Sequence, residues 1–259
     1  MELRSLGSTG IQVSPLGLGS VKFGRNEQVK YPKGFQIPGD SELADLLALA
    51  SELGVNLIDT APAYGSSEER LGRLLPGRRE DWVIVTKVGE QFIEGRSHFD
   101  FSAKATRESV ENSLRRLDTD HLDVVLIHSD GNDLEVLQED VLGELERLKT
   151  EGKLRATGLS GKTVQGGLLA AEMVDVLMVT CNPQYNEELP VLLAAQRLDK
   201  GVLIKKGLMS GHVRSAAEVE QAMAFIFDQP GVSSMIVGTI SPGHLQSNVA
   251  TLERILARR

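Results

Sequence analysis

The chain repeats one pattern of hydrophobic and polar positions. A short run of branched apolar residues is followed by a loop with polar residues and then by an amphipathic stretch with helical spacing. Apolar runs of this length indicate buried strands, and the amphipathic stretches indicate surface helices. The predicted strands are 14–19, 55–58, 82–86, 122–127, 154–159, 176–180, 202–204 and 235–237. The predicted helices are 41–53, 67–74, 102–117, 135–149, 163–171, 189–198, 215–228 and 242–257.

Strands separated by helices run parallel, because each crossover returns the chain to the same end of the sheet. Eight such units can close into a (β/α)8 barrel, and 1–259 is a usual length for one such domain. Residues 3–13 precede the first unit and predict a β-hairpin that plugs the barrel floor. An open doubly wound sheet is the competing architecture. It would need a Gly-rich turn directly after the first strand, and neither Gly17-Leu18-Gly19 nor Gly166-Gly167 has that context.

Polar residues follow the predicted strands, at the end of a barrel where reactive groups gather. Asp59, Lys87 and His128 end three consecutive strands. Taken singly, such an Asp is usually a turn residue, such a Lys is usually solvated, and such a His is usually structural. Together they are expected to converge at the barrel mouth, which favours a functional interpretation.

Tyr64 lies just beyond the second strand and supplies a reactive hydroxyl. A free phenol has a pKa of about 10, and a neighbouring ammonium group lowers it. We expect Lys87 to supply that charge, Asp59 to hold Lys87, and His128 to donate a hydrogen bond to a substrate carbonyl oxygen. This set can protonate a carbonyl, but no side chain provides a hydride, so a nicotinamide cofactor is implied.

Composition narrows the remaining function classes. The formal net charge of -8 provides no basic face for nucleic acid. The single cysteine, Cys181, cannot form an internal disulfide, and no stretch of the chain predicts a signal peptide or a membrane span. A cytoplasmic location without nucleic-acid or membrane partners is therefore expected.

Several segments resemble the aldo-keto reductase superfamily, and the resemblance runs along nearly the whole chain. The similar segments are 6–10, 13–19, 54–61, 64–68, 86–87, 117–123 and 126–128, of which 54–61 with 64–68 is the most specific. The resemblance implies a TIM barrel that passes a hydride from NADPH, or possibly NADH, to a small-molecule aldehyde or ketone. It also implies that Tyr64 is the general acid, that Lys87 and Asp59 tune it, and that His128 orients the carbonyl.

The resemblance further implies a set of cofactor contacts. These are Ser20, Asp59, Ser160, Asn182, Lys205, Lys206, Gly207, Leu208, Gly238, Thr239, Ser241, His244, Ser247 and Asn248. The chain departs from the family at Gly161, where an asparagine is usual, and at 204–208, where an aromatic residue often stacks on the nicotinamide ring. The N-terminus of the helix near Ser241 would offer free backbone donors to a phosphate. The short C-terminus predicts an open substrate pocket, and the insertion 25–40 is either a lid or a passive surface loop.

Two other interpretations remain. A cofactor-binding scaffold or regulatory subunit would keep the barrel, but it would not require the complete set of Tyr64, Lys87, Asp59 and His128. A metal-dependent barrel enzyme needs several ligands at the strand ends, and only Asp59 and His128 qualify, so no metal site is expected. The sequence leaves the substrate and the oligomeric state open.

Overall fold

The computed structural model describes residues 1–258, and its centre is a closed ring of eight parallel strands. In order around the ring, the strands are β3 (Leu16–Gly19), β4 (Leu57–Asp59), β5 (Val83–Val88), β8 (Leu122–His128), β9 (Leu154–Ser160), β10 (Val176–Thr180), β11 (Gly201–Lys205) and β12 (Ser234–Val237). Strand β12 pairs back to β3 and closes the ring. The (β/α)8 prediction is confirmed, and an open sheet is excluded because the ring leaves no unpaired edge.

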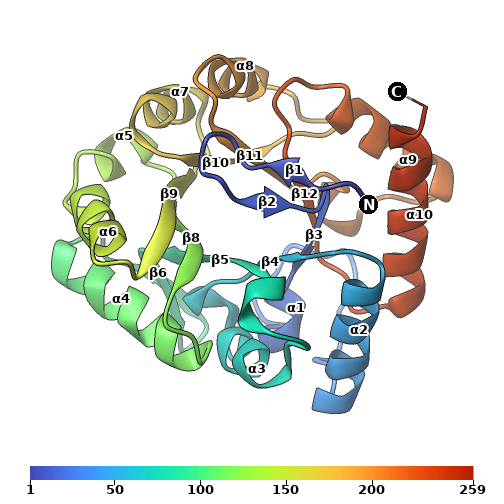
Figure 1. Cartoon of the computed structure of the whole chain (residues 1–259), viewed down its shortest axis with the longest axis horizontal. Helices are drawn as coiled ribbons and strands as arrows, with labels where there is room; N and C mark the ends of the chain where they lie inside the picture. Colours follow the sequence, from blue (N-terminus) through green and yellow to red (C-terminus); the bar gives the residue numbers. More distant parts are fainter. Residues whose placement is uncertain (259) are drawn as a thin grey trace.

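Helices cover the outside of the ring (Figure 1). The long helices are α2 (Asp40–Glu52), α3 (Ser67–Leu74), α4 (Ala103–Arg116), α6 (Val141–Thr150), α7 (Val164–Met173), α8 (Leu189–Arg197), α9 (Ala216–Phe227) and α10 (Pro242–Leu256). Side-chain oxygens of Ser102, Thr163, Ser215 and Ser241 cap four of them. Their apolar faces and the outward side chains of the strands form the larger hydrophobic core. Within residues 1–258 no helix combines the length and apolar character needed to span a membrane.

A hairpin closes one end of the ring, as predicted. Strands β1 (Arg4–Ser5) and β2 (Gln12–Val13) pair antiparallel and lie across the ring in Figure 1. Leu6, Ile11 and Val13 join the side chains that fill the barrel interior. The backbone of Gly7 approaches Gly201 so closely that an added Cβ would lie 2.4 Å from the Gly201 nitrogen. The floor is therefore packed shut.

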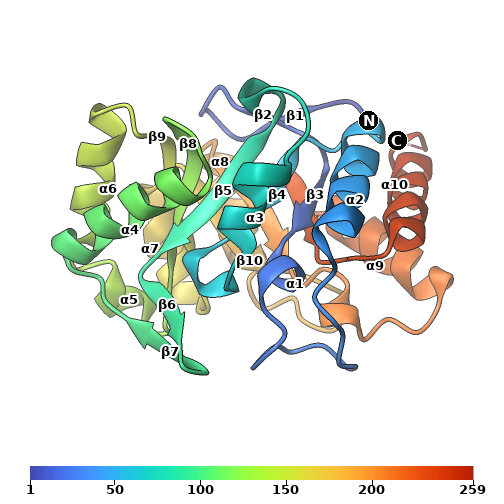
Figure 2. The same cartoon turned by 90° about the horizontal axis from the view of Figure 1, so that it is seen from below.

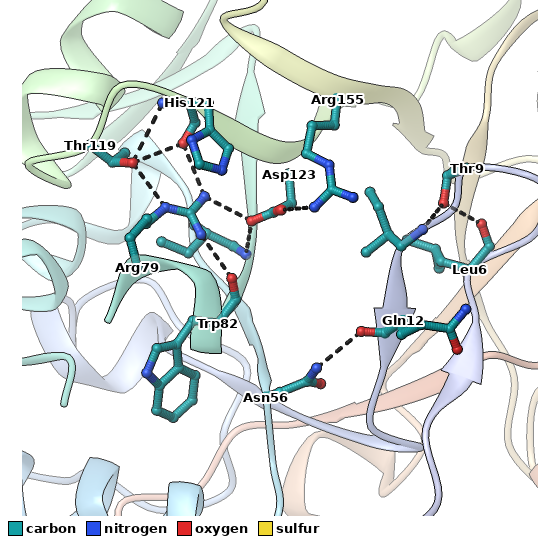
Figure 3. A network of polar contacts seen from close by, with 12 residues as sticks. Leu6, Thr9, Gln12, Asn56, Arg79, Trp82, Thr119, His121, Asp123 and Arg155 are labelled. Atoms are coloured by element: carbon teal, nitrogen blue, oxygen red, sulfur yellow. Dashed lines mark hydrogen bonds and ion pairs between the residues drawn. The ribbon is translucent and has the colours of Figure 1, made fainter. Parts of the chain in front are cut away.

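A polar network surrounds the buried carboxylate of Asp123 near the same end of the barrel (Figure 3). Asp123 accepts from Arg79 Nη2 at 2.8 Å, from the Ile84 amide at 2.9 Å and from Arg155 Nη1 at 2.7 Å. Arg79, in the short 3-10 helix η2 (Arg79–Asp81), also donates to the Trp82 carbonyl at 2.8 Å. The network ties β5, β8 and β9 together where the strands begin.

Two parts of the fold differ from the sequence prediction. The prediction of a single helix over 135–149 is wrong. The structure has two helices here, α5 (Asp133–Val136) and α6, with a turn between them. Asp133 holds α5 in place by accepting hydrogen bonds from the Lys162 and Thr163 amides, whereas α6 packs on α4. One straight helix cannot make both sets of contacts.

The chain also forms elements that the hydrophobic pattern did not indicate. The short helix α1 (Val21–Gly24) follows the first barrel strand, and a second hairpin of β6 (Glu90–Ile93) and β7 (Arg96–Phe99) follows β5. Figure 2 shows this hairpin and the loop after α1 extending from the end opposite to β1 and β2. That end is the mouth of the barrel, where the parallel strands finish.

Candidate active site

Asp59 and Lys87 meet at the mouth as a buried ion pair. Asp59 is the last residue of β4 and Lys87 is the fifth residue of β5, and their exposed fractions are 5% and 1%. Lys87 Nζ donates to Asp59 Oδ1 at 2.5 Å and to the Thr60 carbonyl at 2.8 Å. Burial alone would lower the pKa of Lys87, but Asp59 and Tyr64 outweigh it and the net pKa is raised. Lys87 therefore remains an ammonium ion at neutral pH.

Tyr64 lies beside this pair, at the end of the 3-10 helix η1 (Pro62–Tyr64). Lys87 Nζ is 4.8 Å from the centre of its ring. Close backbone packing fixes the turn that carries it. A Cβ on Gly24 would lie 2.4 Å from the Tyr64 carbonyl oxygen. A Cβ on Gly65, whose φ is 62°, would lie 2.2 Å from the Gly24 carbonyl oxygen.

The pKa of Tyr64 differs from the sequence expectation. Lys87 acts to lower it, as expected, but burial of the phenol acts more strongly and the net pKa is raised. The phenol therefore carries its proton throughout the neutral range.

His128 completes the group at the end of β8. Its ring centre is 6.4 Å from that of Tyr64, and the two rings are nearly perpendicular at 88°. His128 Nδ1 lies 2.7 Å from Glu90 Oε2. Burial lowers the pKa of His128, and Glu90 opposes that effect. The structure thus brings together all four side chains that were predicted to converge.

Two further residues neighbour the site. Glu90 was not predicted there, whereas Tyr31 lies in the insertion 25–40 that was predicted as a lid or a surface loop. Glu90 begins β6, in a largely exposed hairpin with no buried apolar face, in which the Glu94-Gly95 turn is the clearest signal of a strand pair. Tyr31 comes from the loop 25–40, and a Cβ on Gly238 would lie 2.8 Å from its hydroxyl. Lys22 Nζ lies 4.0 Å from the centre of the Tyr31 ring. The loop therefore reaches the barrel mouth, and its action as a lid stays a prediction.

Lys205 and Ser160 form a second polar group, where β11 and β9 end. Lys205 Nζ donates to Ser160 Oγ at 3.0 Å and to the Gly161 carbonyl at 2.6 Å. Burial lowers the pKa of Lys205 to about 7, partly offset by Glu188. The next residue, Lys206, is exposed. Partial desolvation and the charges of Lys30 and Lys162 lower its pKa, and Glu188 opposes them.

Other predicted cofactor residues are held by contacts within the chain. The amide of Asn182 donates to the Lys206 carbonyl at 3.1 Å and accepts from the Gln184 amide at 2.9 Å. Ser20 is fully buried, and its hydroxyl accepts from Ser67 at 2.7 Å. Gly207 is buried so tightly that a Cβ there would lie 2.7 Å from Met235 Sδ. Leu208 is half-buried against the hydrophobic core.

The remaining predicted cofactor residues gather where β12 leads into α10. Thr239 Oγ1 accepts from the Ser241 amide at 3.1 Å, and Ser241 Oγ accepts from the His244 amide at 3.3 Å. The remaining two, on the same helix, are Ser247, which is exposed, and Asn248, which is 8% exposed. Pro242 has no amide hydrogen, and the Leu245 amide donates to the Ser241 carbonyl. In this turn of the described chain only the Gly243 amide is left without a hydrogen bond, at the positive end of a 15-residue helix.

Comparisons with known proteins agree on one family. A model of the Aldo/keto reductase family matches residues 15–187. The chain is similar to L-galactose dehydrogenase from Arabidopsis thaliana, with 28% identity over 98% of this chain and 89% of the relative. It is also similar to methylglyoxal reductase from Escherichia coli, with 30% identity over 82% of this chain and 79% of the relative.

Solved structures agree with this match. A protein from Pseudomonas aeruginosa that is assigned to the aldo-keto reductases is 55% identical, with a TM-score of 0.90 over 98% of this chain and 96% of that chain. An aldo-keto reductase from Bacillus halodurans, solved in its holo form, shares the fold with a TM-score of 0.83 at 22% identity, over 98% of this chain and 91% of that chain.

Proposed function

Because this chain belongs to the aldo/keto reductase family of oxidoreductases, we propose that it reduces an aldehyde or ketone to an alcohol with a nicotinamide cofactor. The observation that supports this proposal most directly is the convergence of Tyr64, Lys87, Asp59 and His128 at one end of the barrel. A proton donor with a buried cation on one side and an imidazole on the other is the arrangement that carbonyl protonation requires.

Tyr64 is the proposed general acid. Its raised pKa keeps the proton on the phenol until a substrate oxygen gains negative charge and becomes a stronger base. Lys87 stabilises the phenolate that remains after proton transfer, since its ammonium group lies near the ring and stays charged. Asp59 holds the ammonium in place and compensates its charge, so Lys87 acts without a large cost of burial.

His128 is proposed to bind the substrate oxygen opposite Tyr64. Its ring faces the Tyr64 ring, so a substrate carbonyl between them receives a hydrogen bond from Tyr64, and also from His128 when the ring nitrogen that faces the substrate carries a proton. Two donors to one oxygen favour charge development there. The substrate carbon then has to face the cofactor, which when bound would supply the hydride that no side chain provides.

The residues at the mouth fit a nicotinamide dinucleotide. The Ser160 hydroxyl suits a carboxamide, and the first turn of α10 suits a phosphate because it presents the Gly243 amide at the positive end of the helix. Lys206 is exposed, with Lys30 and Lys162 close enough to add to its positive field. We propose that this field favours NADPH over NADH, since the 2′-phosphate carries the extra negative charge.

The proposed substrate class is a small oxygen-rich carbonyl compound. The two named relatives act on small polar substrates, since they are called L-galactose dehydrogenase and methylglyoxal reductase. The charged and hydroxyl groups around Tyr64 and His128 match such substrates better than long apolar ones.

A Tyr64→Phe comparison tests the proposed function. Steady-state reduction of methylglyoxal and of simple aldoses would be measured with NADPH and with NADH for both proteins. The proposal expects turnover by the wild type and a loss of about 100-fold or more in kcat for the variant, the scale of general acid catalysis. Cofactor binding without turnover of any carbonyl would instead favour the scaffold interpretation.

A further inference from the structure

Glu90 occupies a position beside His128 that no element of the barrel provides. It begins the additional hairpin of β6 and β7, and its Oε2 lies 2.7 Å from His128 Nδ1. Its other oxygen, Oε1, accepts from the Ser97 hydroxyl at 2.5 Å, so the neighbouring strand of the hairpin holds the carboxylate. Nδ1 is buried and has no aligned hydrogen-bond partner in the described chain, which leaves Glu90 as the acceptor within reach. A buried N–H without a partner is costly, so a small change in the Glu90 torsions that aligns the two groups is favoured.

Arg25 fixes this hairpin against the turn that carries Tyr64. Its guanidinium carbon lies 3.4 Å from the centre of the Phe92 ring. Its Nη1 donates to the Ala63 carbonyl at 3.1 Å, and its Nε donates to the Glu27 carbonyl at 2.9 Å. One arginine thus links the loop after α1, the η1 turn and the β6 strand that carries Glu90.

The charges around the two groups determine their ionisation. Burial favours the neutral form of Glu90, but His128, Ser97 and Arg25 outweigh it and lower its pKa to about 2. Burial also lowers the pKa of His128, with Lys87 and Lys205 acting in the same direction and Glu90 opposing them. Tyr64, which faces the His128 ring, stays protonated and neutral. At neutral pH the pair is therefore a carboxylate beside a neutral imidazole.

A neutral imidazole carries one proton, and the carboxylate determines where it resides. A nitrogen lone pair on Nδ1 would repel Glu90 Oε2 at 2.7 Å, whereas an N–H group would be attracted to it. We propose that Glu90 holds the His128 proton on Nδ1, so that Nε2 accepts a hydrogen bond from a substrate hydroxyl when the ring is neutral and donates to a substrate carbonyl only when the ring is protonated. Glu90 is thus a positioning residue that acts through His128, and the proposal rests on the proposed function of the site.

This assignment makes the favoured direction of the reaction depend on pH. Reduction adds a hydride to the carbonyl carbon and a proton to its oxygen, with reduced nicotinamide as the electron source, and oxidation of the alcohol is the reverse. The protonated ring supports the carbonyl side of this equilibrium, because it offers two N–H groups. The neutral ring supports the alcohol side, because its free Nε2 accepts the substrate O–H. Wild-type reduction should therefore decline, and oxidation should rise, as the pH increases through the pKa of His128.

Imidazole NMR of the full chain tests the tautomer without turnover. The chain has five histidines, and the signals that disappear in His128→Gln identify His128. The wild type should show the Nδ1-protonated tautomer above the pKa of His128. In Glu90→Gln the amide can donate to Nδ1, so the Nε2-protonated tautomer should appear and the pKa of His128 should fall by roughly 1 to 3 units, as expected on loss of a close opposite charge. Glu94→Gln is the matched control, since it removes the same charge from an exposed position of the same hairpin.

Rates in both directions complete the test, with an aldehyde and NADPH or the matching alcohol and NADP+. In the wild type, kcat/KM for reduction should fall about tenfold per pH unit above the pKa of His128, the limit for one required proton. In Glu90→Gln this decline should move to higher pH, because a neutral ring can then donate from Nε2. An unchanged tautomer in Glu90→Gln, or a changed tautomer with the wild-type pH profile, would overturn the proposal. Full turnover by Tyr64→Phe would instead refute the proposed function and leave the NMR result intact.

Discussion

The buried pair of Lys87 and Asp59 allows a stability prediction that can be worked out from the structure. At 2.5 Å, and with an effective dielectric constant of 20, their Coulomb attraction is about 7 kcal/mol. Burial costs several kcal/mol for each ion, so the intact pair contributes little net stability. Removing one partner leaves the other buried and unpaired, and this should cost about 3 kcal/mol or more. Lys87→Met and Asp59→Asn should each show such a loss in the free energy of unfolding.

The double variant Lys87→Met/Asp59→Asn distinguishes this explanation from loss of two independent contacts. Its loss should be smaller than the sum of the single losses by about 2 to 3 kcal/mol, because no unpaired charge remains. Urea denaturation followed by Trp82 emission measures the three values. Trp82 is 3% exposed, so its emission should change when the protein unfolds. It lies just before β5, whereas the ion pair lies near the other end of that strand, so the substitutions do not touch the fluorophore. Losses that add within about 0.5 kcal/mol would refute the reasoning.

Four further predictions follow from single contacts. Asp123→Asn should lower the free energy of unfolding by about 3 kcal/mol, because it leaves Arg79 without its buried carboxylate. Thermal unfolding measures this loss. Arg155→Gln is the control, and its loss should be smaller because Arg155 is a half-exposed partner of Asp123. Gly24→Ala should cost about 1 to 3 kcal/mol and should also reduce turnover, because its Cβ would meet the Tyr64 carbonyl. Gly143→Ala is the control, because its Cβ would meet no atom within 4 Å and its backbone has no positive φ, so this variant should keep wild-type kcat. The pKa of Glu90 is lowered from 4.5 to about 2, so its carboxylate should stabilise the protein above pH 4.5 and lose that contribution as the pH falls toward 2. The Tm values of the wild type and of Glu90→Gln should therefore approach each other in acid. Lys206→Ala should weaken NADPH binding about tenfold, the effect of losing one charged hydrogen bond, while NADH binding stays nearly unchanged. Equal weakening of NADPH and NADH binding would contradict a contact between Lys206 and the 2′-phosphate.

The sequence was sufficient to predict the barrel because the strand and helix periods are regular and each unit repeats the last. The converging side chains could be predicted for the same reason, because parallel strands finish at one end. Asp59, Lys87 and His128 directly follow apolar runs, and Tyr64 lies in the loop just after the second of these strands. The break between α5 and α6 could not be predicted, since the apolar spacing continues through 137–145 and only the contact of Asp133 with the start of α7 requires the turn.

The surroundings of the site were harder to predict. Glu90 was not expected there, and the loop that carries Tyr31 was predicted only as a lid or a surface loop. Both come from segments without a buried apolar face, so periodicity carries no information about where they fold. The pKa of Tyr64 was also misjudged in sign, because burial of the phenol depends on how the η1 turn packs against Gly24 and cannot be read from neighbours in the chain. The nearby charge was foreseen, whereas the desolvation that opposes it was not.

The most direct test of the account is a titration of the purified protein with NADPH and NADH, followed by the emission of the bound cofactor, together with aldehyde reduction by the wild type and by Tyr64→Phe. The account predicts saturable cofactor binding by both proteins, with turnover by the wild type and a loss of about 100-fold or more in Tyr64→Phe. Failure to bind either cofactor, or undiminished reduction by Tyr64→Phe, would contradict it.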